Sequence, residues 1–348
     1  MLRPVRDLFP PTLSPDLVVG LDSPDDAAVW RLDETRLLVV TTDFFTPVVD
    51  DPYDFGAIAA ANSLSDLYAM GARPFLALNV TAMPVDLPAE VVTEILRGGA
   101  EKAWEAGAVI AGGHSVQDRE PKYGLVALGF AEHDRLMTKA AAQPGDILFV
   151  TKPLGTGVTA TALKNGKADD ADVRQITEWM KRLNALASRT AVELGVRAAT
   201  DVTGFGLLGH AAEMAAASQS GLRFHLASVP FFAGAPRYAR EGQFPGGTRD
   251  NEAYFSARVR FEAEIGEVER KLLFDAQTSG GLLIAVPRDR AREFVAAAGI
   301  AALPAWPIGE VVPGQDVTVA ALPMDGWERV DVEGVVFLGA TKRGGTNR

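Results

Sequence analysis

The sequence contains no cysteine among its 348 residues. This absence excludes disulfides, thiolate metal sites and cysteine nucleophiles for these residues. Basic residues are in the minority, because 34 Lys and Arg stand against 45 Asp and Glu, a formal net charge of −11. Such a chain is a poor candidate for binding nucleic acid or an anionic membrane, since both need a cationic surface.

Long hydrophobic runs are also missing. The longest uncharged apolar stretch, residues 294–309, is too short to span a membrane and contains Pro304 and Pro307. Near the N-terminus, charges and prolines interrupt the chain before an apolar signal segment can form. We therefore expect a cytoplasmic protein. Its hydrophobic content of 47% is ordinary for a globular fold, and its length predicts two domains.

Apolar β-branched runs and helical segments alternate along the chain, which is typical of α/β proteins. Strands are expected at 37–42, 75–81, 108–111, 123–132, 146–151, 197–200, 222–227, 281–286 and 305–311. Helices are expected from Asp54, as N-cap, to Met70, and at 88–106, 157–165, 172–195, 205–217 and 288–299, with loops and short helices over 232–270. Small residues and a Pro-Gly turn at 138–145 predict a boundary between domains 1–140 and 141–340, followed by a tail at 341–348.

Five aspartates lie where α/β proteins gather ligands. Asp25 and Asp26 enter a strand from a loop, Asp43 ends a strand, Asp66 lies in an otherwise apolar helix, and Asp201 precedes a glycine-rich turn. Several carboxylates without cysteine suit Mg²⁺ that bridges nucleotide phosphates. Alternatives remain open for each residue taken alone: a turn former, a solvated helix position or a helix N-cap.

Other motifs are ambiguous. GFGLLG (204–209) matches a dinucleotide fingerprint, but no carboxylate follows at 226–232 to hold a ribose. AGGHS (111–115) could contact a phosphate or form a tight turn, and the glycine pairs in PGGTRDN and QTSGGLL favour turns. Lys152 could contact a phosphate, but a lone lysine is expected at the solvated surface. His133, His210 and His225 show no metal-ligand spacing with one another.

Eight segments carry a resemblance to a known family. In order they are SPDDAAVW, TTDFF, ANSLSDLYAMGARP, AGGHS, TKPLGTGV, TDVTGFGLLGH, PGGTRDN and DAQTSGGLL. They resemble the successive signatures of selenophosphate synthetase (selenide, water dikinase) over roughly residues 20–311. This family belongs to the aminoimidazole ribonucleotide synthetase-like superfamily, together with thiamine monophosphate kinase and a hydrogenase maturation protein.

The resemblance implies an α/β (α+β) fold of two domains, with the N-terminal domains pairing in a homodimer through a shared β-barrel. It implies ATP as substrate, several Mg²⁺ ions, and conversion of ATP, selenide and water to selenophosphate, AMP and phosphate. Selenophosphate then serves selenocysteine and selenouridine formation. Carried over by motif, the metal ligands are Asp26, Asp66 and Asp201. The ATP contacts are Ser23, Pro24, Asp25, Asp43, Asp66, Gly113, His114 and Ser115.

One departure concerns the reacting groups. The family carries a glycine-rich segment with a cysteine or selenocysteine and a lysine before the first matched motif, whereas the first lysine here is Lys102. No catalytic residue is therefore assigned. We expect such a segment to precede Met1, as a late start or a selenocysteine codon read as a stop would produce. The alternatives are a catalytically incomplete ATP-binding regulatory homologue, or another ATP-dependent enzyme of the superfamily.

Overall fold

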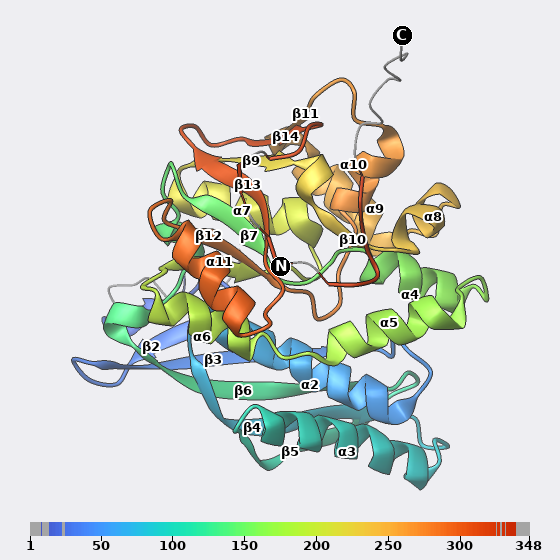
Figure 1. The fold of residues 1–348 in the computed structure, drawn as a ribbon. Coiled ribbons are helices and arrows are strands. Elements are labelled where there is room, and N and C mark those ends of the chain that lie inside the picture. The colour runs from blue at the N-terminus through green and yellow to red at the C-terminus, as the bar shows by residue number, and fades with distance from the viewer. Residues whose placement is uncertain are drawn as a thin grey trace.

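A computed structural model describes Leu8 and residues 14–22, 25–324, 326–327, 329–330 and 332–338. Two sheets with flanking helices form the molecule (Figure 1). Ser23, Pro24 and the predicted tail at 341–348 lie outside the described residues. Within the described ranges, no helix is long and apolar enough to cross a membrane.

The first sheet contains six strands and carries two helices. Its order is β1 (Leu17–Val19), β2 (Ala28–Arg31), β3 (Arg36–Phe45), β6 (Lys122–Glu132), β4 (Arg73–Met83) and β5 (Val109–Gln117). Neighbouring strands are antiparallel except β4 and β5, which are parallel. The helices are α2 (Pro52–Ala69) and α3 (Ala89–Glu105). β5 is one of the two edge strands, and almost all of its residues are exposed.

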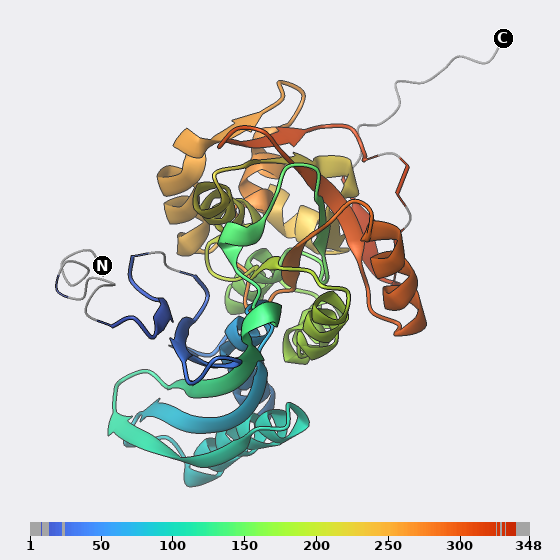
Figure 2. The same ribbon diagram turned by 90° about the vertical axis from the view of Figure 1, so that its left-hand side faces the viewer.

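The second sheet contains seven strands. Its order is β11 (Val259–Phe261), β14 (Val317–Ala320), β9 (Gly221–His225), β13 (Trp306–Val312), β7 (Ile147–Val150), β12 (Leu282–Val286) and β8 (Ala198–Asp201). A small sheet pairs β10 (Pro230–Phe232) with β15 (Val335–Phe337). The two large sheets use separate parts of the chain, and Figure 2 shows the first below the second. The division at 140/141 stays a prediction.

Eight helices accompany the second sheet in the described part of the chain. They are α4 (Thr156–Lys164), α5 (Asp170–Lys181), α6 (Ala185–Glu193), α7 (Gly206–Ser218), α8 (Ala235–Arg240), α9 (Gly246–Phe255), α10 (Glu267–Leu273) and α11 (Ala291–Ile300). Short 3-10 turns occur at η2 (His133–Arg135), η3 (Lys139–Ala141), η4 (Leu226–Ser228) and η5 (Ser256–Arg258). The strands and helices predicted from the sequence are confirmed apart from three local errors. The strands β1, β10, β11, β14 and β15 were not predicted.

Helix α2 lies between the two halves of the molecule. It contacts β3 and β6 of the first sheet and α5, α6 and β8 of the second half (Figure 1). Its sequence is apolar around nearly the whole circumference, as expected for a helix buried on all sides. Gly98 of α3 lets the helices meet closely, because a Cβ there would lie 2.0 Å from the Tyr53 carbonyl oxygen.

The three errors have local causes. Asp51, not Asp54, caps α2 by accepting from the Asp54 N–H, and Asp54 instead pairs with Lys181 at 2.7 Å. The single helix expected at 172–195 is two helices, α5 and α6, because Arg182 adopts an extended conformation. AGGHS does not form a turn after a strand at 108–111, since the strand continues through it as β5.

Candidate functional site

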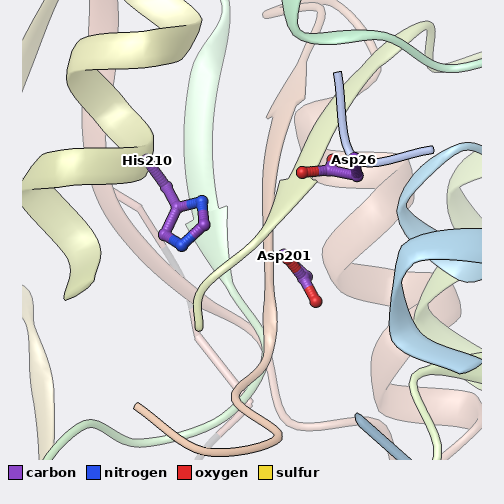
Figure 3. A group of neighbouring side chains, drawn as sticks. All are labelled: Asp26, Asp201 and His210. Carbon is purple, nitrogen blue, oxygen red and sulfur yellow. The ribbon is translucent and has the colours of Figure 1, made fainter. Parts of the chain in front are cut away.

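Three side chains converge between the two halves of the molecule. Ligand atoms of Asp26, Asp201 and His210 all lie within 4.8 Å of one another (Figure 3). Asp26 comes from the loop before β2, Asp201 ends β8, and His210 lies on α7. Asp26 is far from Asp201 and His210 in the sequence, so only the tertiary fold brings all three together.

A tight turn brings Asp201 and His210 together. Gly206 begins α7 with a φ of +69°, and a Cβ there would lie 2.7 Å from the Phe274 carbonyl carbon and oxygen. Only glycine fits both constraints. Gly206 of GFGLLG thus serves the entry into α7. His210 is buried, and burial together with the nearby Lys139 ammonium lowers its pKa to about 3.

The Asp26 carboxylate is held in place through one oxygen, and its other oxygen has no hydrogen-bond partner among the described residues. Its Oδ1 accepts from the Thr200 hydroxyl at 2.9 Å and lies 2.8 Å from Lys139 Nζ. Although burial disfavours the lysine charge, the Asp26 and Glu213 carboxylates raise the pKa of Lys139 above its usual range. Asp26 Oδ2 is buried and has no hydrogen-bond partner in the described part of the chain. One oxygen is therefore free to bind a cation.

Asp201 shows the same pattern at the end of β8. Its side chain is buried, and its Oδ2 likewise lacks a partner among the residues that the structure describes. Burial, followed by the negative charge of Asp26, raises its pKa to about 7. Buried oxygens without partners cost free energy unless a ligand satisfies them. The orphaned oxygens of Asp26 and Asp201 thus fit a hard cation such as Mg²⁺.

Two further carboxylates face this pair. Asp66 of α2 accepts a hydrogen bond from the Thr41 hydroxyl, and Asp43 of β3 accepts one from the Asn62 amide. Burial, followed by repulsion from Asp201 and Asp26, raises the pKa of Asp66 well above its usual range. Burial also raises the pKa of Asp43. Carboxylates that repel one another in this way favour bound cations between them. The structure therefore brings together Asp26, Asp43, Asp66 and Asp201, as expected.

A cavity of about 350 Å³ opens beside these carboxylates. Its lining residues are Asp43, Phe45, Asn62, Thr203, Gly204, Phe205, His210, Gln277 and Thr278. They come from β3 and α2 in the first half of the molecule, and from the loop after β8, α7 and the QTSGG segment (277–281) in the second half. A ligand bound there would therefore touch both halves. The volume suits a small molecule or part of one.

Asp25 has a fastening role in the structure. Its Oδ1 accepts from the Asp26 N–H and its Oδ2 from the Lys139 N–H, both at 2.9 Å. Burial and the neighbouring Asp26 raise its pKa to about 7. Oδ2 thus ties the Asp26 loop to η3, while Oδ1 orders the loop itself. Contact of Asp25 with ATP stays a prediction.

The remaining predicted ATP contacts lie elsewhere. Gly113, His114 and Ser115 are on β5, and β6 and β4 separate that strand from β3, which carries Asp43. They line a second cavity of about 850 Å³ at the sheet edge. A single copy of the chain therefore does not bring them to the carboxylate cluster.

Sequence reasoning missed several residues of the site. Lys139 and Asn62 gave no separate signal, and His210 was considered only against other histidines. The expectation for Lys152 is wrong: it is buried, its Nζ donates to the Arg182 and Ser279 carbonyls at 2.7 Å, and burial lowers its pKa to about 7. The hydrogen bond from Lys152 to the Ser279 carbonyl helps to position the QTSGG segment. In the same segment, the Ser279 N–H donates to Asn62 Oδ1.

Similar proteins identify the family to which the chain belongs. Residues 24–131 match the family described as AIR synthase related protein, N-terminal domain, and residues 143–321 match its C-terminal domain. Selenide, water dikinase of Carboxydothermus hydrogenoformans is 47% identical over 294 residues, which are 84% of this chain and 85% of that protein. The protein of the same name from Caldanaerobacter subterraneus subsp. tengcongensis is 50% identical over 282 residues, 81% of each.

Solved structures share the fold. The hydrogenase maturation protein HypE, determined in complex with ATP, matches with a TM-score of 0.62 and 20% identity over 87% of each chain. At that identity the likeness concerns the fold, which is thus the two-domain α/β fold of the AIR synthase superfamily. The relatives are far closer in sequence and share one name. On these grounds the chain belongs to the selenide, water dikinase family.

Proposed function

We propose that the chain is an enzyme that uses ATP, selenide and water to make selenophosphate, AMP and phosphate. The name shared by relatives at 42–50% identity supports this reaction. The single structural observation that carries it is the group of four buried or partly buried aspartates around the orphaned oxygens of Asp26 and Asp201. ATP occurs in the cytoplasm, and we place the reaction there.

The orphaned oxygens of Asp26 and Asp201 supply two of the proposed metal ligands, and the resemblance adds Asp66. Asp26, Asp66 and Asp201 would together hold several Mg²⁺ ions that take part in ATP binding. Bound Mg²⁺ neutralises negative charge on the phosphates and so favours their transfer. The chain's own residues do the positioning: Thr200 and Lys139 orient Asp26, and the Thr41 hydroxyl orients Asp66.

The nucleotide would occupy the cavity beside the carboxylates. Asp43 lines that cavity and is oriented by Asn62, which in turn accepts from the Ser279 N–H at 2.7 Å. This series of hydrogen bonds runs from the second half of the molecule into the first. Ser23, Pro24 and Asp25 are proposed as further ATP contacts from the resemblance.

We further propose a homodimer that completes this site. If Gly113, His114 and Ser115 contact ATP, as the resemblance implies, they must do so from another copy, because β6 and β4 separate them from Asp43. β5 is suited to pairing, since it is an exposed edge strand with Val109 and Val116 each 53% exposed. The two first sheets would then join into the shared β-barrel.

An assay of the products tests the reaction. We expect AMP release that depends on selenide, measured anaerobically with Mg-ATP, for the chain fused to a glycine-rich N-terminal segment that contains cysteine and lysine. The unfused chain, which has no cysteine, serves as the comparison and should bind Mg-ATP without turnover. ADP as the only product would contradict the proposal and indicate an enzyme that transfers a single phosphoryl group from ATP. ATP binding without turnover in both proteins would instead favour a regulatory homologue.

A further inference from the structure

The environment of His210 determines which ring nitrogen carries a proton. Its Nε2 lies 3.1 Å from the backbone nitrogen of Thr203 and 3.4 Å from that of Phe205. Both backbone groups are N–H donors, and Nε2 can satisfy them only as an acceptor without a proton of its own. The proton of the imidazole must therefore reside on Nδ1.

The other nitrogen, Nδ1, has no such partner. It is buried without a hydrogen bond among the described residues, and the Glu213 carboxylate lies 4.0 Å away, beyond hydrogen-bond reach. Figure 3 shows the ring with one nitrogen on the side that faces Asp26. A buried N–H donor without an acceptor is costly, and this one lies on the side of Asp26, where the proposed function places Mg²⁺ and the phosphates of ATP.

This arrangement makes His210 a poor metal ligand despite its place beside Asp26 and Asp201. A nitrogen that carries a proton has no lone pair for a cation. Moving that proton to Nε2 would set an N–H against the Thr203 N–H at 3.1 Å. The cation thus depends on the carboxylates, and the imidazole is left to donate.

We propose that the Nδ1–H of His210 donates a hydrogen bond to a phosphate oxygen of the bound nucleotide, so that His210 is a phosphate-binding residue and not a metal ligand. His210 lines the cavity beside Asp43 and lies near Lys139, which adds a positive charge to the same region. The inference rests on the proposed function, because it takes ATP as the occupant of this cavity.

Two variants separate the two ring nitrogens. In His210→Gln the side-chain oxygen can reach the Nε2 position and accept from Thr203, but no donor remains at the Nδ1 position. In His210→Asn the amide can supply a donor near Nδ1 but does not reach Thr203. For both variants we would measure three quantities: Mn²⁺ affinity without nucleotide, Mg-ATP affinity by calorimetry, and the thermal melting temperature.

For His210→Gln we expect wild-type melting, Mn²⁺ affinity within about twofold of wild type, and Mg-ATP affinity weakened about tenfold or more, as loss of a hydrogen bond to a charged group would cause. His210→Asn should melt earlier yet keep more Mg-ATP affinity than His210→Gln. Unchanged Mg-ATP affinity in His210→Gln would overturn the inference, and so would a matching loss of Mn²⁺ affinity, which would make His210 a metal ligand.

The tautomer can also be observed directly. In protein labelled with ¹⁵N-histidine, long-range ¹H–¹⁵N spectra distinguish a protonated Nδ1 from a protonated Nε2. The chain has four histidines, and the signals that vanish in His210→Gln identify this one. We expect a protonated Nδ1 with and without Mg²⁺, whereas a protonated Nε2 would overturn the inference. Failure of the wild-type chain to bind Mg-ATP would instead count against the proposed function.

Discussion

At the scale of single residues, buried aspartates have two different roles, and their hydrogen-bond partners decide which. Asp275 is fully buried, but its carboxylate accepts from the Val158 N–H, the Gln277 amide and the Thr248 hydroxyl at 3.0–3.1 Å. It therefore anchors the start of α4, and both of its oxygens already accept hydrogen bonds. Asp26 and Asp201 each retain a buried oxygen without a partner in the described ranges, which marks them for a ligand.

Asp275 should make stability depend on pH. Burial raises its pKa from the ordinary 3.8 to about 7, so the native state binds this proton more tightly than the unfolded chain. The stabilisation is complete below about pH 4 and is lost as the pH rises to about 7. Between pH 4 and 8, the free energy of unfolding of the wild type should therefore fall by up to about 4 kcal/mol more than that of Asp275→Asn.

Urea unfolding of both proteins without Mg-ATP measures this difference. The other carboxylates with raised pKa values contribute equally to the pH dependence of both proteins. The difference between the two proteins therefore reports on Asp275 alone. Parallel pH dependence in the two proteins would show that Asp275 does not titrate in this range.

The residues of the site that sequence reasoning found are those with a local signal. Asp26, Asp43 and Asp201 stand at strand boundaries, and Asp66 is a charge in an apolar helix. Lys139 and His210 have no such signal, because their importance comes from contacts with Asp26 more than 100 residues away. The error for Lys152 has the same origin, since its carbonyl partners belong to distant turns.

At the scale of elements, the turn between α5 and α6 connects the two halves of the site. The amide of Asn184 donates to the Ser65 hydroxyl of α2 and to the Gly280 carbonyl of the QTSGG segment, both at 2.9 Å. Asn184 is itself buried. The turn thus fixes α2, which carries Asn62 and Asp66, against the segment that closes the cavity.

Asn184→Ala should therefore affect both stability and binding. Loss of two buried hydrogen bonds should cost about 2–3 kcal/mol of unfolding free energy, and misplacement of α2 should weaken Mg-ATP binding. Asn165→Ala is the matched control, because that exposed amide bonds only to the Gln243 side chain among the described contacts. Urea unfolding and calorimetry measure the two effects. Equal, small losses in both variants would show that the turn does not position α2.

Elements were predicted well where apolar periodicity is strong and poorly where tertiary contacts decide. The helical pattern over 172–195 is continuous, and only the contacts of Asn184 reveal why the chain breaks there. AGGHS has the composition of a turn, yet pairing of β5 with β4 extends the strand through it. The capping aspartate of α2 was misplaced by three residues because Asp51 and Asp54 are both chemically suitable.

At the scale of the whole molecule, the exposed edge of β5 predicts assembly. Val116→Lys places a charge on that edge and should convert a dimer into a monomer in sedimentation experiments. Mg-ATP affinity should fall as well, because Gly113, His114 and Ser115 would no longer reach a second copy. Ile300→Lys is the control, since Ile300 is 90% exposed at the end of α11, far along the chain from β5. A dimer that survives Val116→Lys would place the interface elsewhere.

We propose that the aspartates between the two sheets bind Mg-ATP, and the variant Asp66→Asn provides the test. Thermal melting is measured with and without Mg-ATP for the wild type, for Asp66→Asn and for Asp33→Asn, a control on the exposed turn before β3. Without ligand, Asp66→Asn should be as stable as the wild type or more so, because it removes repulsion with Asp201 and Asp26. Saturating Mg-ATP should stabilise the wild type and the control by about 2.7 kcal/mol at 100 times the Kd, but not Asp66→Asn. A variant that melts earlier without ligand yet keeps the full Mg-ATP stabilisation would contradict the claim and make Asp66 a structural residue of α2.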